Sequence, residues 1–156
     1  MTTKTGIEPI RKAINVNAPV ERAFATFTDG ITGWWPLETH SVGAGRNGVR
    51  AETAVFEGRI GGRLYERMSD GDEADWGEVL VWEPPSRVVL TWHPGYEDSA
   101  QWTEIEVRFT PEGNGTRVDL EHRGWERLGE RATQARSGYD SGWEFVLGKF
   151  EGAASA

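Results

Sequence analysis

The acid–base chemistry that this sequence could support begins with Glu66, a carboxylate whose neighbours place it inside a fold. In the segment Arg63–Met68, Leu64 and Met68 alternate with longer polar side chains, which is the period of a half-buried β-strand. Glu66 lies between the two apolar residues and shares their face, so its side chain is expected to point into the core. Burying a carboxylate is costly unless it is paired or protonated, so this position requires a partner, a ligand or a proton.

His122 is expected to face the same interior from a second strand. In the segment Thr116–Arg123, the alternation that buries Leu120 also turns the imidazole of His122 inward. Glu66 and His122 would then hold a polar group of a ligand or act as an acid and a base. The alternative is that they pair with each other or with a buried arginine and only stabilise the sheet. The sequence leaves both interpretations open.

Tryptophan is the second feature that could carry a function. The chain has 8 Trp and 20 Gly among 156 residues. Rigid rings either fill a core or wall a cavity that flexible side chains would close. Trp34, Trp35 and His40 lie on a connection stiffened by Pro36, where aromatic residues border a pocket or pack the connection onto a sheet. The packing role suits Trp34 better than Trp35.

Two other strands also carry tryptophan. Trp92 shares its parity with Leu90 and is expected to face the interior of the fold. On the neighbouring strand, Trp76 and Trp82 have one parity and Val79 has the other, so both sets compete for the inside. Alternation alone does not decide which of them faces inward.

Several kinds of site are not indicated by the sequence. There is no cysteine, which excludes disulfides, thiol nucleophiles and thiolate metal ligands. His40, His93 and His122 are far apart and lack paired ligand spacing, so neither a metal nor another cofactor is expected. The glycines at 43 and 45 do not join a strand to a helix, as a dinucleotide-binding motif requires.

Length and charge set further limits. The 156 residues fit one domain, expected over residues 1–156 with an ordered core at about 9–151. A formal net charge of −8 repels phosphate backbones, so nucleic acid is not an expected partner. No apolar run reaches the ~18 residues of a membrane span, and residues 1–9 show no secretory signal. We therefore expect a cytoplasmic protein without a membrane span.

The elements that must position these side chains follow from the spacing of apolar residues. A first strand, Ile10–Val16, precedes a short helix that begins at Pro19 and a second short helical turn. Six segments of period two follow, and the short turns between them favour antiparallel pairing. These six strands are expected at Thr53–Glu57, Arg63–Met68, Trp76–Glu83, Arg87–His93, Trp102–Thr110 and Thr116–Arg123.

The last segment has apolar residues at intervals of three and four, which predicts one long helix over Gly129–Glu151. Tyr139 and Trp143 lie on its apolar face, which is available to cover a curved sheet. Gly142 lies on or beside that face, although glycine costs ~1 kcal/mol in a helix relative to alanine. It would permit a close approach to the sheet or leave room for something bound. Because one helix cannot fill a concave sheet, a pocket is expected between them.

This order of elements resembles the helix-grip (START-like) superfamily, and within it the bacterial single-domain proteins similar to the C-terminal domain of the heat-shock protein 90 ATPase activator. The resemblance covers roughly Ile10 to Phe150 and implies an α+β fold. That fold is a curved antiparallel seven-stranded sheet wrapped around a long C-terminal helix, with two short helices after the first strand. The resemblance rests on the Pro-started helix and on GGRLYERM (61–68), WGEVLVWEPPSRVVLTW (76–92), GTRVDLEHRGWERLG (115–129) and GYDSGWEFVLGKF (138–150).

The resemblance implies a mostly apolar cavity between the sheet and the helix. The first hypothesis is therefore binding of a hydrophobic small molecule, either lipid-like or polycyclic and polyketide-like. The expected ligand contacts are Trp35, Leu64, Glu66, Met68, Trp92, His122, Tyr139 and Trp143.

Two alternatives use the same scaffold. One is a cyclase- or dehydratase-type enzyme in which His122 and Glu66 transfer protons, although the family offers no common catalytic motif to carry over. The other is a chaperone-interaction module, which ranks last because the extra N-terminal domain of eukaryotic activators has no counterpart in these residues. A monomer and a homodimer are both compatible with the sequence.

Overall fold

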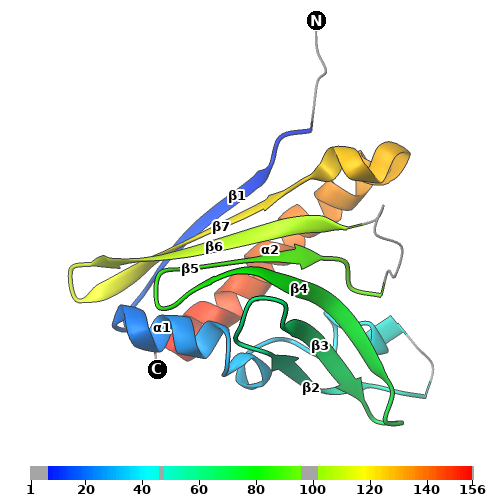
Figure 1. The fold of residues 1–156 in the computed structure, drawn as a ribbon, viewed down its shortest axis with the longest axis horizontal. Helices are drawn as coiled ribbons and strands as arrows, with labels where there is room; N and C mark the ends of the chain where they lie inside the picture. Colours follow the sequence, from blue (N-terminus) through cyan, green and yellow to red (C-terminus); the bar gives the residue numbers. More distant parts are fainter. Residues whose placement is uncertain (1–6, 46–47, 96–101, 156) are drawn as a thin grey trace, which may run out of the picture.

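An antiparallel sheet of seven strands, in the order β1-β7-β6-β5-β4-β3-β2, is the frame of the protein (Figure 1). The computed structural model describes residues 7–45, 48–95 and 102–155. Each strand pairs antiparallel with its neighbours, as the short turns predicted. The strands are β1 (Ile10–Val16), β2 (Ala51–Phe56), β3 (Arg63–Met68), β4 (Glu73–Glu83), β5 (Arg87–Trp92), β6 (Thr103–Glu112) and β7 (Gly115–Arg123).

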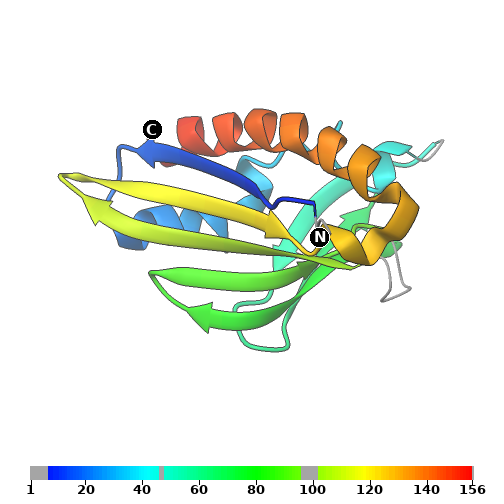
Figure 2. The same cartoon turned by 90° about the horizontal axis from the view of Figure 1, so that it is seen from above.

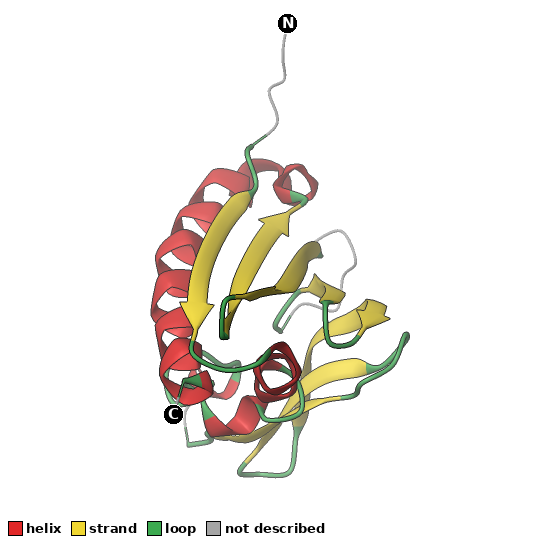
Figure 3. Cartoon of the chain, turned by 90° about the vertical axis from the view of Figure 1, so that its left-hand side faces the viewer, coloured by secondary structure: helices red, strands yellow, loops and turns green. Residues whose placement is uncertain are grey.

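Helices cover one face of this curved sheet. The long helix α2 (Ala132–Ala154) packs along β1 and against α1 (Val20–Phe27), and it lies along one side of the curled sheet in Figures 2 and 3. The described residues also form the short 3₁₀ segments η1 (Ile31–Gly33), η2 (Gly43–Gly45) and η4 (Trp125–Arg131). The α+β helix-grip architecture expected from the sequence is confirmed.

The start of the long helix differs from the expectation. Gly129 has φ 57° and ψ −125°, a conformation outside the helical region, and it kinks the chain within η4, just before α2 begins. The α-helix therefore begins at Ala132 rather than at Gly129, and it continues to Ala154, past Glu151. The spacing of apolar residues does not reveal this break, because Trp125 and Leu128 in η4 are also buried. Periodicity located the helix, whereas one backbone conformation set its beginning.

Two bulges in β4 explain why alternation could not orient its tryptophans. The pairing of β4 with β3 skips Trp76, and its pairing with β5 skips Leu80. Each extra residue inverts the alternation of the side chains that follow it. As a result Trp76, Val79 and Trp82 all face the concave side, where the ring of Trp82 lies 5.1 Å from that of Phe24.

The concave face is filled by aromatic rings at the end nearest α1. Phe27 contacts Phe109 and Phe150 edge-on, with ring centroids 5.8 and 5.2 Å apart. Trp34 extends this cluster, because its ring lies 5.1 Å from Phe150 and its indole N–H donates to the carbonyl of Thr26 at 2.8 Å. Trp34 therefore packs its connection onto the body of the protein, as the sequence favoured. The space that remains lies toward the other end of the sheet.

Candidate functional site

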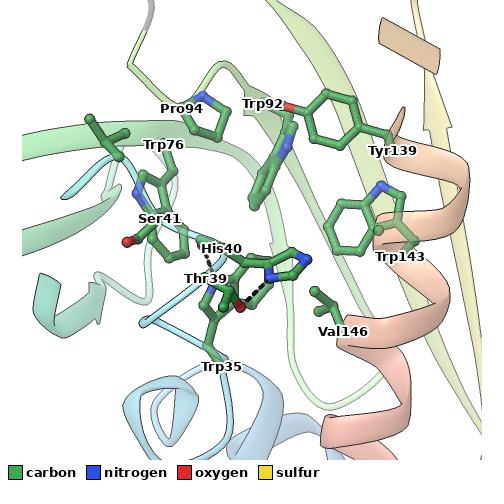
Figure 4. Close-up of a pocket in the computed structure, with 12 residues that line it drawn as sticks. Trp35, Thr39, His40, Ser41, Trp76, Trp92, Pro94, Tyr139, Trp143 and Val146 are labelled. Atoms are coloured by element: carbon green, nitrogen blue, oxygen red, sulfur yellow. Dashed lines mark hydrogen bonds between the residues drawn. The ribbon is translucent and has the colours of Figure 1, made fainter. Parts of the chain in front are cut away.

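A pocket of about 260 Å³ lies between the sheet and α2 (Figure 4). Three parts of the chain line it: the strands β4 and β5, the loop that follows η1, and one face of α2. Most of the lining side chains are apolar, and the polar ones are Thr39, His40 and Ser41 on the loop and Tyr139 on the helix. This is the region where a helix across a concave sheet was expected to leave a pocket.

Four tryptophans, called here the indole cage, form a continuous apolar wall: Trp35, Trp76, Trp92 and Trp143. The ring centroids of Trp35 and Trp76 are 5.0 Å apart, and those of Trp92 and Trp143 are 5.3 Å apart. Trp35 also lies 5.8 Å from Trp92 and 6.0 Å from Trp143. Each indole is therefore held by at least two others, so the wall is rigid and does not close over the empty space.

The indole N–H groups of the cage differ in how they are satisfied. Three of them donate to protein acceptors: Trp35 to the carbonyl of His40 at 2.7 Å, Trp76 to Glu66 Oε1 at 2.6 Å and Trp143 to His122 Nδ1 at 2.9 Å. The fourth, that of Trp92, is buried and has no hydrogen-bond partner within the described residues. The two inward polar residues found by parity are thus acceptors for two cage indoles.

Glu66 is completely buried on β3 and binds the loop that lines the pocket. Its two carboxylate oxygens accept the backbone N–H groups of Val42 and Gly43, each at 2.7 Å. One of the same oxygens also accepts the indole N–H of Trp76. The carboxylate therefore joins a strand, a loop and the indole cage, and its three donors are all uncharged.

His122 joins α2 to the sheet on the other side of the pocket. Its Nδ1 accepts from the Trp143 indole, so the ring proton lies on Nε2, which is 2.6 Å from Thr103 Oγ1. The Thr103 hydroxyl in turn donates to the backbone carbonyl of Trp92 at 3.0 Å. Burial lowers the pKa of His122 to about 3, because the charged imidazolium would lose its hydration. This neutral chain fixes the relative position of Trp143 and Trp92.

His40 is the imidazole that lines the pocket itself. Its Nδ1 lies 2.7 Å from Thr39 Oγ1, and its ring stacks at 5.0 Å on Phe145, which is 47% exposed on α2. Figure 4 shows its other ring nitrogen pointing across the pocket toward Trp143. A loop residue and a helix residue thus meet at the rim, so the loop borders the pocket as its aromatic residues suggested.

The structure divides the eight site residues expected from the sequence into two groups. Four of them lie on the pocket wall: Trp35, Trp92, Tyr139 and Trp143. The other four are buried behind it: Leu64, Glu66, Met68 and His122. Both oxygens of Glu66 and both ring nitrogens of His122 are occupied by protein groups, so acid–base roles for these two gain no support from the geometry. Ligand contact by the buried four stays a prediction.

Some wall residues had a weaker signal in the sequence. Trp76 was left undecided because a bulge, which alternation does not reveal, turns it inward. Thr39, Ser41 and Val42 were not singled out, and their only signal was their position beside His40 on the same connection. Gly142 also lines the pocket, and an added Cβ there would meet nothing within 4 Å. Of its two expected roles, the structure favours leaving room over close approach to the sheet.

Two general features of the described residues bear on the kind of site. No helix among them is both long enough and apolar enough to cross a membrane. Within residues 7–45, 48–95 and 102–155, no group of three or more His, Cys, Asp or Glu side chains is arranged to hold a metal ion.

Comparison with known proteins gives the pocket a context. The structure resembles that of an anthrahydroquino-gamma-pyrone synthase, Txn09, complexed with SUM, with 36% sequence identity and a TM-score of 0.57 over 88% of this chain and 90% of that chain. It also resembles CalU16 from Micromonospora echinospora, with 25% identity and a TM-score of 0.60 over 95% of this chain and 74% of that one. None of the curated proteins compared with the sequence matches it.

A third similar structure is the Aha1 dimer from Colwellia psychrerythraea, with 19% identity and a TM-score of 0.63 over 96% of this chain and 97% of that chain. At that identity the likeness concerns the fold alone. Fold and pocket together define a helix-grip protein whose sheet and C-terminal helix enclose an apolar pocket. Residues 17–154 match the family described as activator of Hsp90 ATPase homolog 1-like protein, and the chain belongs to that family.

We predict that Glu66→Leu lowers the free energy of unfolding by more than about 3 kcal/mol, because two buried N–H donors and one part-buried N–H donor lose their acceptor. Urea denaturation measures the change, and amide exchange at Val42 and Gly43 should accelerate in the milder Glu66→Gln variant. Glu38→Gln, an exposed change on the same loop, serves as the control and should stay within ~0.5 kcal/mol. Equal stability of Glu66→Leu and Glu38→Gln would contradict the role given to Glu66.

We also predict a pH dependence that originates at His122. Because its pKa falls from 6.5 to about 3 on folding, the unfolded chain binds a proton between these values and the folded chain does not. Stability from this residue is complete above about pH 6.5 and is lost on acidification, at up to about 1.4 kcal/mol per pH unit. Urea midpoints from pH 7.5 to 4.5, compared with those of His122→Gln, isolate this contribution from that of the carboxylates. Parallel curves for the two proteins would show that the prediction is wrong.

Proposed function

We propose that the protein binds a planar, hydrophobic small molecule in the pocket between the sheet and α2. The observation that carries this proposal is the indole cage, whose four rings border empty space although they are themselves nearly completely buried. A flat apolar ligand would fill the pocket and contact the apolar side chains that line it. The few polar groups on the loop and on Tyr139 would orient such a ligand.

The size of the pocket favours one of the two ligand classes considered from the sequence. About 260 Å³ is at the small end of ligand pockets, which usually measure ≈ 300–1,000 Å³. A lipid with long acyl chains needs a longer and more flexible cavity than one walled by interlocked indoles. A compact ring system of a few fused rings matches both the volume and the flat walls. The polycyclic, polyketide-like class is therefore the one that we propose.

The comparison with the 36% identical synthase supports the same class. That protein carries the name of an anthrahydroquino-gamma-pyrone synthase and was solved complexed with SUM, and the likeness covers 90% of its chain. Its name describes a fused-ring product made by a protein of this fold. We transfer to the present chain the class of molecule, a planar oxygenated polycycle, and treat it as a proposal.

Gly142 offers a direct test. We predict that Gly142→Leu weakens binding of anthracene-2-sulfonate, a planar three-ring probe, at least tenfold, because the new side chain grows into the pocket space that an added Cβ leaves open. Quenching of tryptophan fluorescence measures the affinity. Gly148→Leu, on the exposed side of the same helix, adds the same atoms away from the pocket and should bind like the parent. Unchanged binding by a folded Gly142→Leu variant would place the ligand elsewhere.

An enzymatic use of the same pocket is the second candidate, and His40 is the observation that favours it. Thr39 Oγ1 lies 3.5 Å from the carbonyl of Pro36, which can accept the hydroxyl proton. In that arrangement Nδ1 of His40 donates to Thr39, and its Nε2 faces the pocket. An unprotonated imidazole beside a bound ketone is a general base for abstraction of a proton α to the carbonyl, a step that ring-forming condensations require.

We predict that such a base accelerates hydrogen–deuterium exchange at the methyl group of 2-acetylnaphthalene in D₂O, followed by NMR. His40→Gln should lose the acceleration about 100-fold or more while still binding anthracene-2-sulfonate. Glu38→Gln, an exposed change on the same loop outside the pocket lining, should keep it. Absence of acceleration by the parent protein, or an equal rate in His40→Gln, would remove the enzymatic candidate and leave the binding function.

The remaining expectations are kept as proposals of lower rank. The large apolar side chains exposed in the described residues are Ile60 on the connection between β2 and β3, Leu80 on β4 and Phe145 on α2, and a chaperone-interaction role stays a prediction of lower rank. The dimer seen for a 19% identical protein leaves the choice between monomer and homodimer open. A cytoplasmic location likewise stays a prediction from the sequence.

A further inference from the structure

The Trp92 N–H is an exception within the indole cage. Trp35, Trp76 and Trp143 each give their indole proton to a protein acceptor between 2.6 and 2.9 Å away. Trp92 is 96% buried, since 4% of it is exposed, yet its Nε1 has no hydrogen-bond partner within the described residues. Buried donors without a partner are uncommon in native proteins and are costly. A phenylalanine at 92 would provide the same apolar wall without that cost.

The position of this donor associates it with the pocket. Trp92 lines the pocket and is held there by the rings of Trp35, Trp76 and Trp143, so its orientation is fixed. Figure 4 shows its nitrogen on the ring edge turned toward Tyr139 and Trp143. The nearby acceptor on that side, His122 Nδ1, already receives the proton of Trp143. The missing acceptor can therefore be supplied by a molecule that occupies the pocket.

An occupant reaches this nitrogen by moving a neighbouring ring. The atom is buried, so an acceptor oxygen must displace a side chain that covers it. Tyr139 is half-buried, and it lies beside the nitrogen in Figure 4 on a helix that has glycines at 138 and 142. Its ring contacts those of His122 and Trp125, with centroid distances of 5.0 and 5.7 Å, so an acceptor that reaches the nitrogen must move the ring out of these contacts. Ligand binding and satisfaction of the Trp92 N–H would then occur together.

The chemistry of the wall selects the ligand group. Indole faces are electron-rich, so they stack best on an electron-poor ring, and the available donor requires an acceptor on that ring. A carbonyl conjugated with a fused aromatic system, as in a quinone or a pyrone, has both properties. A quaternary ammonium ion would suit the aromatic faces, but it would bring positive charge against an N–H proton and leave the donor unpaired. We propose that Trp92 Nε1 donates a hydrogen bond to a ring carbonyl oxygen of the bound polycycle.

This inference rests on the proposed function, and two matched probes separate the two. Anthraquinone-2-sulfonate and anthracene-2-sulfonate share shape and charge, and they differ in the two ring carbonyls. We expect the parent protein to bind the quinone about 5- to 10-fold more tightly, the value of one added hydrogen bond. Trp92→Phe should remove that preference, so that the variant binds the two probes with affinities within about twofold of each other.

A matched control uses the same substitution at another member of the cage. Trp35→Phe removes an indole N–H that already has a protein acceptor, so it should weaken both probes alike and keep the preference for the quinone. In the unmodified protein, the Trp92 indole N–H resonance of a ¹⁵N spectrum should move downfield with the quinone and stay in place with the anthracene.

The outcomes identify which proposal fails. A Trp92→Phe variant that keeps the quinone preference, or an indole resonance that responds equally to both probes, overturns the role of Trp92 and leaves ligand binding in place. If the parent binds the two probes equally, the donor has no acceptor in the ligand and the inference is wrong. If it binds neither probe, the proposed function fails together with the inference.

Discussion

The carboxylate of Glu66 imposes the constraint on which much of the site depends. It lies completely buried on β3, and its donors are two loop N–H groups and one indole. A buried charge without these bonds would be strongly destabilising. The loop with Thr39 and His40 must therefore lie against the sheet, and the bulge in β4 must turn Trp76 inward. One electrostatic requirement thus positions two sides of the pocket.

On the opposite side of the pocket, the wall is held by hydrogen bonds of an uncharged residue, His122. His122 stays neutral because burial lowers the pKa of its imidazole to about 3. Its Nδ1 accepts a hydrogen bond from Trp143, and its Nε2 donates one to Thr103. A neutral imidazole with one acceptor and one donor suits a place between a helix indole and a strand hydroxyl. The cage is thereby held from β3 and from β7, and its rings stay apart although each is buried.

The fold could be predicted from the sequence because the spacing of apolar residues within each segment indicates its secondary structure. Alternation located every strand, and inward orientation of Glu66 and His122 followed from their apolar neighbours. What alternation could not supply was the pair of bulges in β4, since an extra residue leaves no mark on composition, and the break at Gly129. The hydrogen-bond partners of Glu66 could not be predicted from the sequence either, because backbone N–H groups of a loop carry no sequence signature.

The same reasoning explains why burial and ligand contact are different properties here. Parity identifies residues that face the interior, but the interior has two layers, a polar set bonded to protein and an aromatic set beside open space. Glu66 and His122 belong to the first layer and keep the second in place. Gly142 belongs to neither: it weakens α2 by about 1 kcal/mol relative to alanine, and the space above it stays empty. A helix that fills this position with a methyl group would be more stable and would have a smaller pocket, so the glycine favours the volume of the pocket over the stability of the helix.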